Sequence, residues 1–591
     1  MDRKNLLLAA LFLLAGNAWA QDAGKVISLL PTGVKVNIDT DRKWGKQKDL
    51  VVVGSKEKGY KAFFAASDGE HGEELWVTDG TKEGTHLVKD INIGSSTSNP
   101  SYLGRLNDKV LFAADEGNNE GLQLWISDGT EEGTKLLKAI NPLGSAEPKG
   151  FCQVNEHQAI FTAIDEESAT YNDPSGATDQ ESWLWVTDGT EEGTYRIKDV
   201  NVQIPGMKHE NMQTPYCRVG RKVYFKGKTA DDDYGEELWI TDGTENGTYM
   251  VKDIRTDPDE TNPSKTLGSH LDNFENYNNE LLFFTCWTKA YGHEVWRSDG
   301  TDEGTFIVKD LNPTVNPTTG EGDGCGPFGC GWEVYKDCIL LRAMTPETGY
   351  ELAAANLKDK TIDVFDIFKG YATNADGTQS INNSYPDPGC IFDGVYMFCA
   401  ATGFDATKPD NYGGEMMYFD GSEVKLQKDF VPGVGCDWVK EPTVAGGSLY
   451  WYNEDNSLVG SGFGSGLYRL DSKDATPVVC NTITSTGDFV NTLKNLGGTI
   501  IYTSNTQETK GLYAYEYTKP GWDGVSDMGY LEPDFGGKTD GIKEIAHEND
   551  LKGVDVYTID GVLLRHNVSL LKSLEGLAKG IYIVNGKKVI K

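Results

Sequence analysis

The sequence predicts an all-β protein: a β-propeller of about eight or nine four-stranded blades, followed by a small C-terminal β-sandwich-like domain. Five near-identical segments recur through the first half of the 591 residues. Short apolar runs rich in β-branched and aromatic residues fill the intervals between them, and no stretch shows a sustained helical period. Repeats of this size, built from strands, are typical of propellers.

The five repeats share a tryptophan followed by the turn sequence Asp-Gly-Thr-x-x-Gly-Thr. Their aspartates are Asp79, Asp128, Asp188, Asp242 and Asp299, at intervals of 49, 60, 54 and 57 residues. A supersecondary unit of that length cannot bury its own faces, so it must stack against its neighbours. We therefore expect the five copies to be consecutive blades.

Each copy holds four β-rich runs, and the shared turn lies between the third and the fourth. The aspartate is suited to capping backbone amides, and the glycines to positive φ. The tryptophan is a large wedge for the space between blades. A turn repeated five times could instead be five ligand sites, but its identity from copy to copy favours a structural staple.

Beyond residue 312 the signature is lost while the rhythm of four runs persists. Residues 332–367, 389–430, 443–479 and 489–517 each look like a blade, which gives nine with the first five. The last of these has only three clear runs. We expect the N-terminal segment Val26–Leu30 to supply its fourth strand and close the ring without exposed edges.

These segments resemble the Glu-Leu-Trp-x-x-Asp-Gly-Thr repeat family of exported bacterial proteins. The resemblance covers about residues 42 to 312, and it departs at Gln123, at Trp183 and at Val295. It implies a repeat fold and carries no catalytic residues.

The chain begins like an export signal. Arg3 and Lys4 precede an apolar run from Leu6 to Leu14, and a small-x-small cleavage site ends at Ala20. That run is too short for a permanent transmembrane helix, and we expect no transmembrane segment elsewhere. The expected organisation is a signal peptide at 1–20, the propeller at 21–520, a linker at 521–549 and a separate domain at 550–591.

The last segment, which ends in Lys-Gly-Ile-Tyr-Ile-Val-Asn-Gly-Lys-Lys at residues 579–588, resembles the C-terminal sorting domain of type IX secretion substrates in Bacteroidetes. The resemblance covers about 45 residues, and the proline-containing first motif of that family is not evident. It implies the secretion machinery as a partner, and a location outside the cell or on its outer surface. The alternative is a small β-sandwich that caps the chain.

The formal net charge of −35 excludes nucleic acid as a partner and opposes binding to anionic lipid. Ten cysteines in an exported chain permit disulfides, with Cys325 and Cys330 the expected local pair, although others such as Cys286 are interpreted as buried thiols. No metal-binding pair is found among the eight histidines. We expect no cofactor, although the acidic stretches 231–233 and 257–260 could bind calcium.

In a four-stranded blade, the loops between strands 2 and 3 lie on the same face as the linkers to the next blade. Here these segments are long and unlike one another; examples are 165–182, 227–235, 255–268, 312–331 and 401–414. Variable loops on a rigid scaffold commonly carry binding. Their aromatic residues are the candidate ligand contacts: Tyr171, Tyr234, Trp287, Tyr291, Trp332, Tyr412 and Trp438.

We therefore expect a protein that binds a glycan or a surface protein through this face. One alternative is a propeller enzyme that cleaves a polysaccharide as a hydrolase or a lyase. No catalytic pair can be nominated for it, because Asp and Glu occur throughout the chain. A second alternative is a structural or adhesive surface protein.

Overall fold

The computed structural model describes the following residues of the chain: 24–37, 50–168, 170–172, 178–202, 216–229, 233–260, 262–326, 333–374, 376–403, 412–429, 439–453, 466–482, 489–505, 510–524, 554–558, 563–568, 581–584 and 587–590. All regular elements among them are β-strands, and none of these residues belongs to a helix that could cross a bilayer. The chain divides into two compact units, residues 1–535 and 536–591. The proposed signal peptide lies outside the described residues.

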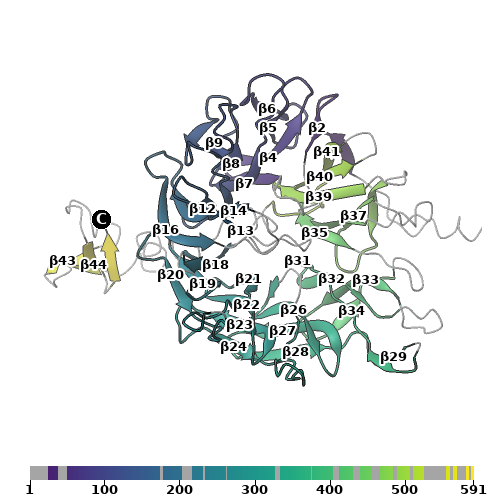
Figure 1. Cartoon of the computed structure of the whole chain (residues 1–591). Helices are drawn as coiled ribbons and strands as arrows, with labels where there is room; N and C mark the ends of the chain where they lie inside the picture. The colour runs from purple at the N-terminus through teal and green to yellow at the C-terminus, as the bar shows by residue number, and fades with distance from the viewer. Residues whose placement is uncertain are drawn as a thin grey trace, which may run out of the picture. The chain divides into compact units, whose positions relative to one another are not determined.

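The first unit is a ring of nine four-stranded antiparallel blades (Figure 1), so the propeller prediction is confirmed, with nine blades. Blade 1 comprises β3 (Val51–Ser55), β4 (Gly59–Ser67), β5 (Glu73–Thr78) and β6 (His86–Lys89), and blade 2 comprises β7 (Ser101–Leu106), β8 (Lys109–Ala114), β9 (Gln123–Ser127) and β10 (Lys135–Lys138). Blade 3 comprises β11 (Lys149–Gln153), β12 (Ala159–Ala163), β15 (Trp183–Thr187) and β16 (Tyr195–Val202), and blade 4 comprises β17 (Tyr216–Val219), β18 (Lys222–Thr229), β19 (Glu237–Thr241) and β20 (Tyr249–Lys252). Blade 5 comprises β21 (Asp272–Tyr277), β22 (Leu281–Thr288), β23 (Gly292–Ser298) and β24 (Phe306–Lys309).

Blades 6 to 9 are those in which the turn signature is absent. Blade 6 comprises β25 (Glu333–Tyr335), β26 (Cys338–Thr345), β27 (Gly349–Asn356) and β28 (Thr361–Phe365), and blade 7 comprises β31 (Cys390–Phe392), β32 (Val395–Ala401), β33 (Gly414–Phe419) and β34 (Val424–Leu426). Blade 8 comprises β35 (Lys440–Ala445), β36 (Ser448–Asn453), β37 (Gly466–Leu470) and β38 (Val478–Thr482), and blade 9 comprises β39 (Phe489–Leu496), β40 (Thr499–Asn505), β41 (Lys510–Glu516) and β1 (Lys25–Ser28). In the blades whose first strand is labelled in Figure 1 (β7, β21, β31, β35 and β39), that strand lies nearest the ring axis.

The N-terminal strand closes the ring, as the sequence predicts. β1 pairs antiparallel with β41, with Val26 opposite Tyr515 and Ile27 opposite Ala514. The residues that follow, Leu29 and Leu30, are buried in one core cluster with side chains of both the first and the last blade. A short strand, β2 (Lys35–Val36), then adds to β4. First and last blades are thus joined by a sheet and a shared core, which leaves no open end in the ring.

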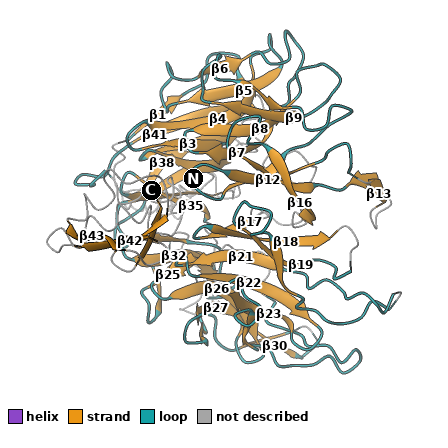
Figure 2. Ribbon diagram, turned by 90° about the vertical axis from the view of Figure 1, so that its left-hand side faces the viewer, coloured by secondary structure: helices purple, strands orange, loops and turns teal. Residues whose placement is uncertain are grey.

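Two hairpins and one long strand depart from the regular blade. β13 (Thr170–Asn172) and β14 (Thr178–Gln180) form a hairpin in the 2–3 loop of blade 3, and it projects from one side of the ring in Figure 2. β29 (Tyr371–Thr373) and β30 (Gln379–Ile381) form a second hairpin in the linker from blade 6 to blade 7. The eight-residue β16 pairs with β18 of the next blade, so blades 3 and 4 share one continuous sheet.

The repeated turn is held by hydrogen bonds that use every residue type in its signature. In blade 2, Asp128 Oδ1 accepts from the backbone N–H of Thr130 at 2.9 Å and from its hydroxyl at 2.7 Å. Thr130 Oγ1 in turn accepts from the N–H of Gly133 at 2.9 Å, and Thr134 Oγ1 lies 2.7 Å from Ser127 Oγ. The other four copies make the same bonds. The motif is therefore a self-contained turn.

The same turn rests on the preceding blade. Gly129 has a φ of 89°, and a Cβ built there would lie 3.3 Å from the ring of Phe63 in blade 1. In blade 5 a Cβ on Gly300 would lie 2.9 Å from Ile240 of blade 4. Glycine is needed here both for the backbone conformation and for the close approach. These contacts support the structural interpretation of the repeated turn.

A lysine near the end of each fourth strand reaches forward to the next blade. In each of the first five blades its ammonium group donates to a backbone carbonyl of the next blade: Lys89 to Thr134, Lys138 to Thr194, Lys198 to Thr248, Lys252 to Asp302 and Lys309 to Ile362.

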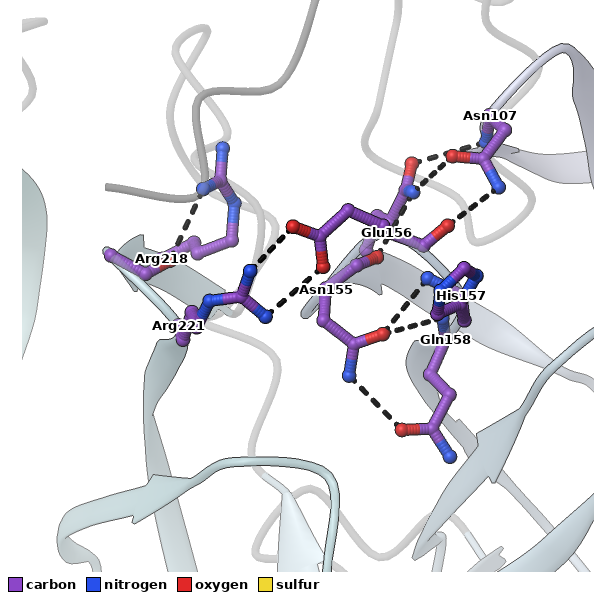
Figure 3. A network of polar contacts seen from close by, with 9 residues as sticks. Asn107, Asn155, Glu156, His157, Gln158, Arg218 and Arg221 are labelled. Carbon is purple, nitrogen blue, oxygen red and sulfur yellow. Dashed lines mark hydrogen bonds and ion pairs between the residues drawn. The ribbon is translucent and has the colours of Figure 1, made fainter. Parts of the chain in front are cut away.

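The 1–2 turns also bridge blades. Figure 3 shows Arg221 of blade 4 paired with Glu156 of blade 3, while the side-chain amide of Asn107 in blade 2 donates to the Glu156 carbonyl.

A buried glutamate ties the third strand of blades 1, 4, 5 and 6 to the following linker. In blade 6, Glu351 is fully buried and accepts from the N–H of Ile367 at 2.8 Å, the N–H of Ser384 at 3.0 Å and the Ser384 hydroxyl at 2.6 Å. Glu74 and Glu237 make equivalent bonds in blades 1 and 4, and Gln123 takes this role in blade 2. We call this arrangement the glutamate clip. It fixes the path of the linker in these blades.

Blade 5 has a cysteine where the other clips have a serine. Cys325 is buried, and its N–H donates to the His293 carbonyl at 2.8 Å, as that of Ser269 does to Glu236. Its thiol lies beside the clip residue Glu294 and is free, so the expected disulfide with Cys330, which is itself outside the described residues, is wrong. The interpretation of Cys286 as a buried thiol is confirmed. A thiol fills the place of the clip serine because both are small and can face a carboxylate.

The second unit, described by itself, is one antiparallel sheet. Its strands are β42 (Val554–Thr558), β43 (Leu563–Val568), β44 (Ile581–Val584) and β45 (Lys587–Ile590), in the order β43-β42-β44-β45. A second, facing sheet is not found in the part of this unit that the structure describes. The sandwich expected from the sequence is therefore not established.

Replacing Asp128 with alanine should lower the free energy of unfolding by about 0.5–2 kcal/mol, because two hydrogen bonds of the turn are lost. Chemical denaturation of the purified protein measures the change. Asp376→Ala is the matched control, because Asp376 makes the same two bonds to Thr378 in the exposed hairpin β29–β30. An equal or larger loss in the control would contradict the inter-blade role of the repeated turn.

The clip predicts that stability falls as pH rises above about 5. Burial raises the pKa of Glu237 from its ordinary 4.5 to about 8, so the folded protein binds this proton more tightly than the unfolded chain does. The stabilisation is complete below pH 4.5 and is lost as pH rises through 8. Glu237→Gln, which places in blade 4 the amide that Gln123 provides in blade 2, should flatten this part of the pH profile. The urea midpoint, followed from about pH 5 to about pH 8.5, measures the effect. An unchanged slope would show that Glu237 does not titrate there.

Candidate functional site

The face that carries the 2–3 loops and the linkers is built from paired segments. In blade 4 the linker donates from Thr266 N to Asp233 O, and from Ser269 N to Glu236 O, both at 3.0 Å. In blade 5 Gly322 N donates to Lys289 O at 3.0 Å. In these blades the linker is thus hydrogen bonded to the 2–3 loop of its own blade. We call this side of the ring the long-loop face.

Exposed apolar side chains of the ring gather on the long-loop face. They come from linkers and 2–3 loops of several blades: Ile93, Leu143, Tyr234, Tyr291, Val315, Tyr371 and Tyr385. Ile93 and Leu143 each precede a glycine in the linkers that follow blades 1 and 2, and they are 85% and 84% exposed. Beside the repeated turns, the large apolar side chains described as exposed are Tyr195 and Tyr249. Exposed apolar groups that collect on one face indicate an interaction surface.

The predicted ligand contacts are only partly found together. Tyr234 and Tyr291 are exposed in the 2–3 loops of blades 4 and 5, and Tyr412 is half-buried in that of blade 7. Tyr171 is described only as a backbone position in β13. Trp332 and Trp438 lie outside the described residues. The set is therefore distributed over several blades of one face, and the structure does not unite it in a single pocket.

Trp287, at the end of β22, belongs to a small aromatic and basic group. The Arg255 guanidinium lies 4.2 Å from the centre of its indole, and the His270 ring meets it edge-on at 6.3 Å. Arg255 is also paired with Asp257 at 3.1 Å. Burial lowers the pKa of His270, and that of His293 to about 4, so both imidazoles are neutral at about pH 7. This group is therefore largely satisfied by its own contacts.

A second aromatic pair was not predicted from the sequence. Tyr350 of β27 and Tyr385 of the linker from blade 6 to blade 7 are stacked, with ring centres 5.5 Å apart and planes 24° from parallel. The Arg342 guanidinium lies 5.9 Å from the centre of the Tyr350 ring. Tyr385 is 47% exposed, whereas Tyr350 is half-buried and burial raises its pKa. The pair presents one ring to solvent and rests the other against the blade.

The backbone of Tyr385 adopts a conformation that its side chain disfavours. Its φ is +44°, and its N–H and that of Ser384 both point to the Tyr350 carbonyl. The same linker position has positive φ in four other blades, where it is occupied by Asn99, Glu147, His270 and Gly326. Glycine and asparagine suit this region, whereas a bulky residue there costs about 1–2 kcal/mol. Asparagine and glycine, which occupy this position in two of the other linkers, therefore suit the backbone conformation better than tyrosine does.

Two carboxylates on the inner strands have raised pKa values without belonging to a glutamate clip. Burial raises the pKa of Glu275 in β21 and of Glu333 in β25 to about 7, and the two charges repel one another. They belong to adjacent blades, 5 and 6. Among the described residues no group of three or more His, Cys, Asp and Glu side chains could hold a metal ion. The calcium suggested for 257–260 gains no support from the described geometry, and residues 231 and 232 lie outside it.

No family model matches the chain, and no curated protein matches it. Solved structures that resemble it include dipeptidyl peptidase 4 of Porphyromonas gingivalis, with 11% identity and a TM-score of 0.40 over 77% of this chain and 62% of that one. The β-propeller domain of the trilobed protease from Pyrococcus furiosus has 12% identity and a TM-score of 0.28, over 62% of this chain and 95% of that domain. A puromycin-hydrolysing peptidase of Mycobacterium tuberculosis has 11% identity and a TM-score of 0.30, over 75% of this chain and 61% of that one. The chain thus spans less than two thirds of these two whole peptidases.

Proposed function

We propose that the protein is an exported binding protein that recognises a glycan through the long-loop face of its propeller. The observation that carries the proposal is the concentration of exposed tyrosines and aliphatic side chains on that face, above linkers held by buried clips. Aromatic rings offer flat apolar surfaces with a polar hydroxyl at the edge, which suits the C–H face and the hydroxyls of a sugar ring. The rigid scaffold beneath limits the entropy lost on binding.

A protein partner on the same face is the second form of this proposal. Ile93, Leu143 and Val315 are aliphatic, and such side chains contribute more to contacts with a protein than to contacts with a sugar. They belong to blades 1, 2 and 5, whereas the exposed tyrosines of this face belong to blades 4, 5 and 6. The tyrosines therefore support the glycan, and the aliphatic residues support a protein contact elsewhere on the face.

An enzyme that cleaves a polysaccharide is the alternative. The carboxylates with raised pKa values in the clips are buried and accept hydrogen bonds from the linkers, so they cannot reach a substrate. Among the described acids, Glu275 and Glu333 combine a pKa of about 7 with partial exposure. A hydrolytic mechanism built from the described acids would use these two as acid and base.

Glycan-array binding with product analysis on each positive glycan tests the proposal. We expect binding without new reducing or unsaturated ends. The double variant Tyr234→Ala and Tyr291→Ala should weaken binding, because two exposed rings of the long-loop face are lost. Tyr195→Ala is the matched control, since Tyr195 is similarly exposed but lies beside a repeated turn. Cleavage that Glu275→Gln or Glu333→Gln abolishes would establish the enzyme instead.

We further propose that the C-terminal unit is an address read by a secretion machinery that delivers the protein to the outer surface. The support is its separate compact fold and its basic end, with Lys587 and Lys588 on β45 of a chain that is otherwise acidic. The export-signal pattern at residues 1–20 is consistent with entry into the periplasm first.

Deleting residues 552–591 should trap the protein in the periplasm while the thermal midpoint of the ring stays unchanged. The ring has its own core and closes through β1, so it needs nothing from the tail to fold. Fractionation of the producing cells, followed by a thermal melt of the truncated protein, measures both. Truncated protein that still reaches the surface or the medium would contradict the address. A lowered midpoint would show that the tail stabilises the ring.

A further inference from the structure

We propose that Tyr385, stacked on Tyr350 beside Arg342, is the principal stacking platform for a neutral sugar ring on the long-loop face. This inference rests on the proposed function and narrows it to named residues and one class of ligand. Neither Tyr385 nor Tyr350 belongs to the set of aromatic residues that the sequence analysis expects as ligand contacts.

The conformation of Tyr385 points to a role in binding. A tyrosine with a φ of +44° is unusual, although the corresponding position also has positive φ in four other blades, where the residues are Asn99, Glu147, His270 and Gly326. Strain of this kind persists where the surrounding structure imposes it, and such positions cluster at ligand sites. Here the clip imposes it, because Ser384 is bound to Glu351 and the following N–H is directed at the Tyr350 carbonyl. The linker thus holds the Tyr385 ring in place at a cost to the backbone.

The surroundings of the ring fit a sugar. Tyr350 lies behind Tyr385 at 5.5 Å and supports it, so Tyr385 does not need to be ordered when a ligand binds. Polar groups stand close by: the Arg342 guanidinium is 5.9 Å from the Tyr350 ring, and Asn383 Oδ1 accepts from Tyr350 N at 2.8 Å. A pyranose stacked on the outer ring would meet the aromatic face with its C–H groups and find hydrogen-bonding groups at its edge.

The charge of the protein selects among sugars. With a net charge of −35 the chain repels polyanions, and a single guanidinium at the platform does not reverse that field. Nucleobases could stack on the same ring, but their phosphates are excluded for the same reason. Neutral hexose polymers meet no such repulsion. The platform therefore favours a neutral glycan over a uronate or sulfated one.

The test compares Tyr385→Asn with the unaltered full-length protein in affinity electrophoresis through gels that contain dextran, mixed-linkage β-glucan, mannan or galactan, with polygalacturonate as the anionic probe. We expect the unaltered protein to be retarded by at least one neutral polymer and not by polygalacturonate. Tyr385→Asn should weaken the retardation about tenfold, while the urea midpoint stays the same or rises because the backbone strain is relieved. Tyr385→Phe should keep the binding, since it keeps the ring.

Glu147→Asn is the matched control, because Glu147 occupies the same strained position in blade 2 with a φ of +44°. It should share the stability effect and leave binding unchanged. A lowered midpoint for Tyr385→Asn would overturn the inference by showing that the ring is there for packing. Retained binding in Tyr385→Asn, or binding to polygalacturonate alone, would also overturn it, while leaving the long-loop face as a glycan site. A negative array with the unaltered protein would instead refute the proposed function itself.

Discussion

Each of the first five blades packs on the blade before it through a turn whose glycine leaves little room for a side chain, and this contact sets how one blade stacks on the next. Gly129, Gly189 and Gly243 approach side chains of the preceding blade so closely that a Cβ would be 3.1–3.3 Å away. The contact also occurs where the ring closes, because a Cβ built on Gly80 of blade 1 would lie 3.2 Å from Leu496 of blade 9. The junction between the last blade and the first thus uses the same glycine contact as the junctions between consecutive blades, and β1 completes the sheet of the last blade there. A ring assembled from one repeated interface tolerates loss of the signature in blades 6 to 9, provided that their strands still stack.

The sequence predicts the strands and the turns because both are written in local patterns. It also predicts the closure by Val26–Leu30, since a blade with three strands must find a fourth. It missed the clip, whose two ends lie far apart: Ser98 is 24 residues from Glu74, and Ser384 is 33 from Glu351. The sequence does contain a shared pattern for the clip, Gly-x-Glu. This pattern is kept at Glu351 and Glu415, in blades that have neither the tryptophan nor the turn signature. A search centred on the tryptophan could not find it, because alanine or methionine replaces that residue there.

The candidate site could be assigned to a face but not to residues. Loop length and aromatic content are visible in the sequence, and Tyr234 and Tyr291 are exposed as expected. Which rings meet depends on linker paths that the clips determine, and no pattern shows that Tyr385 has positive φ or that it lies on Tyr350. One indirect signal existed. Asn99, Glu147, Gly326 and Tyr385 are each followed by proline in the sequence, so an alignment of the linkers would have placed a tyrosine where asparagine and glycine also occur.

Our proposal prefers binding to catalysis because of how the acidic groups of the described residues are used. The clip glutamates of blades 1, 4 and 6 are buried, and each accepts hydrogen bonds from backbone N–H groups. Catalysis by paired carboxylates needs acids that face a substrate and titrate near the working pH. Glu275 and Glu333 meet the second condition, but they lie on inner strands, away from the exposed rings of the linkers and loops. A sugar stacked on Tyr385 would thus be held by a rigid platform while the clip carboxylate beneath it remains committed to the backbone. Such a separation of exposed aromatic rings from accessible carboxyl groups is expected of a protein that binds its ligand without cleaving it.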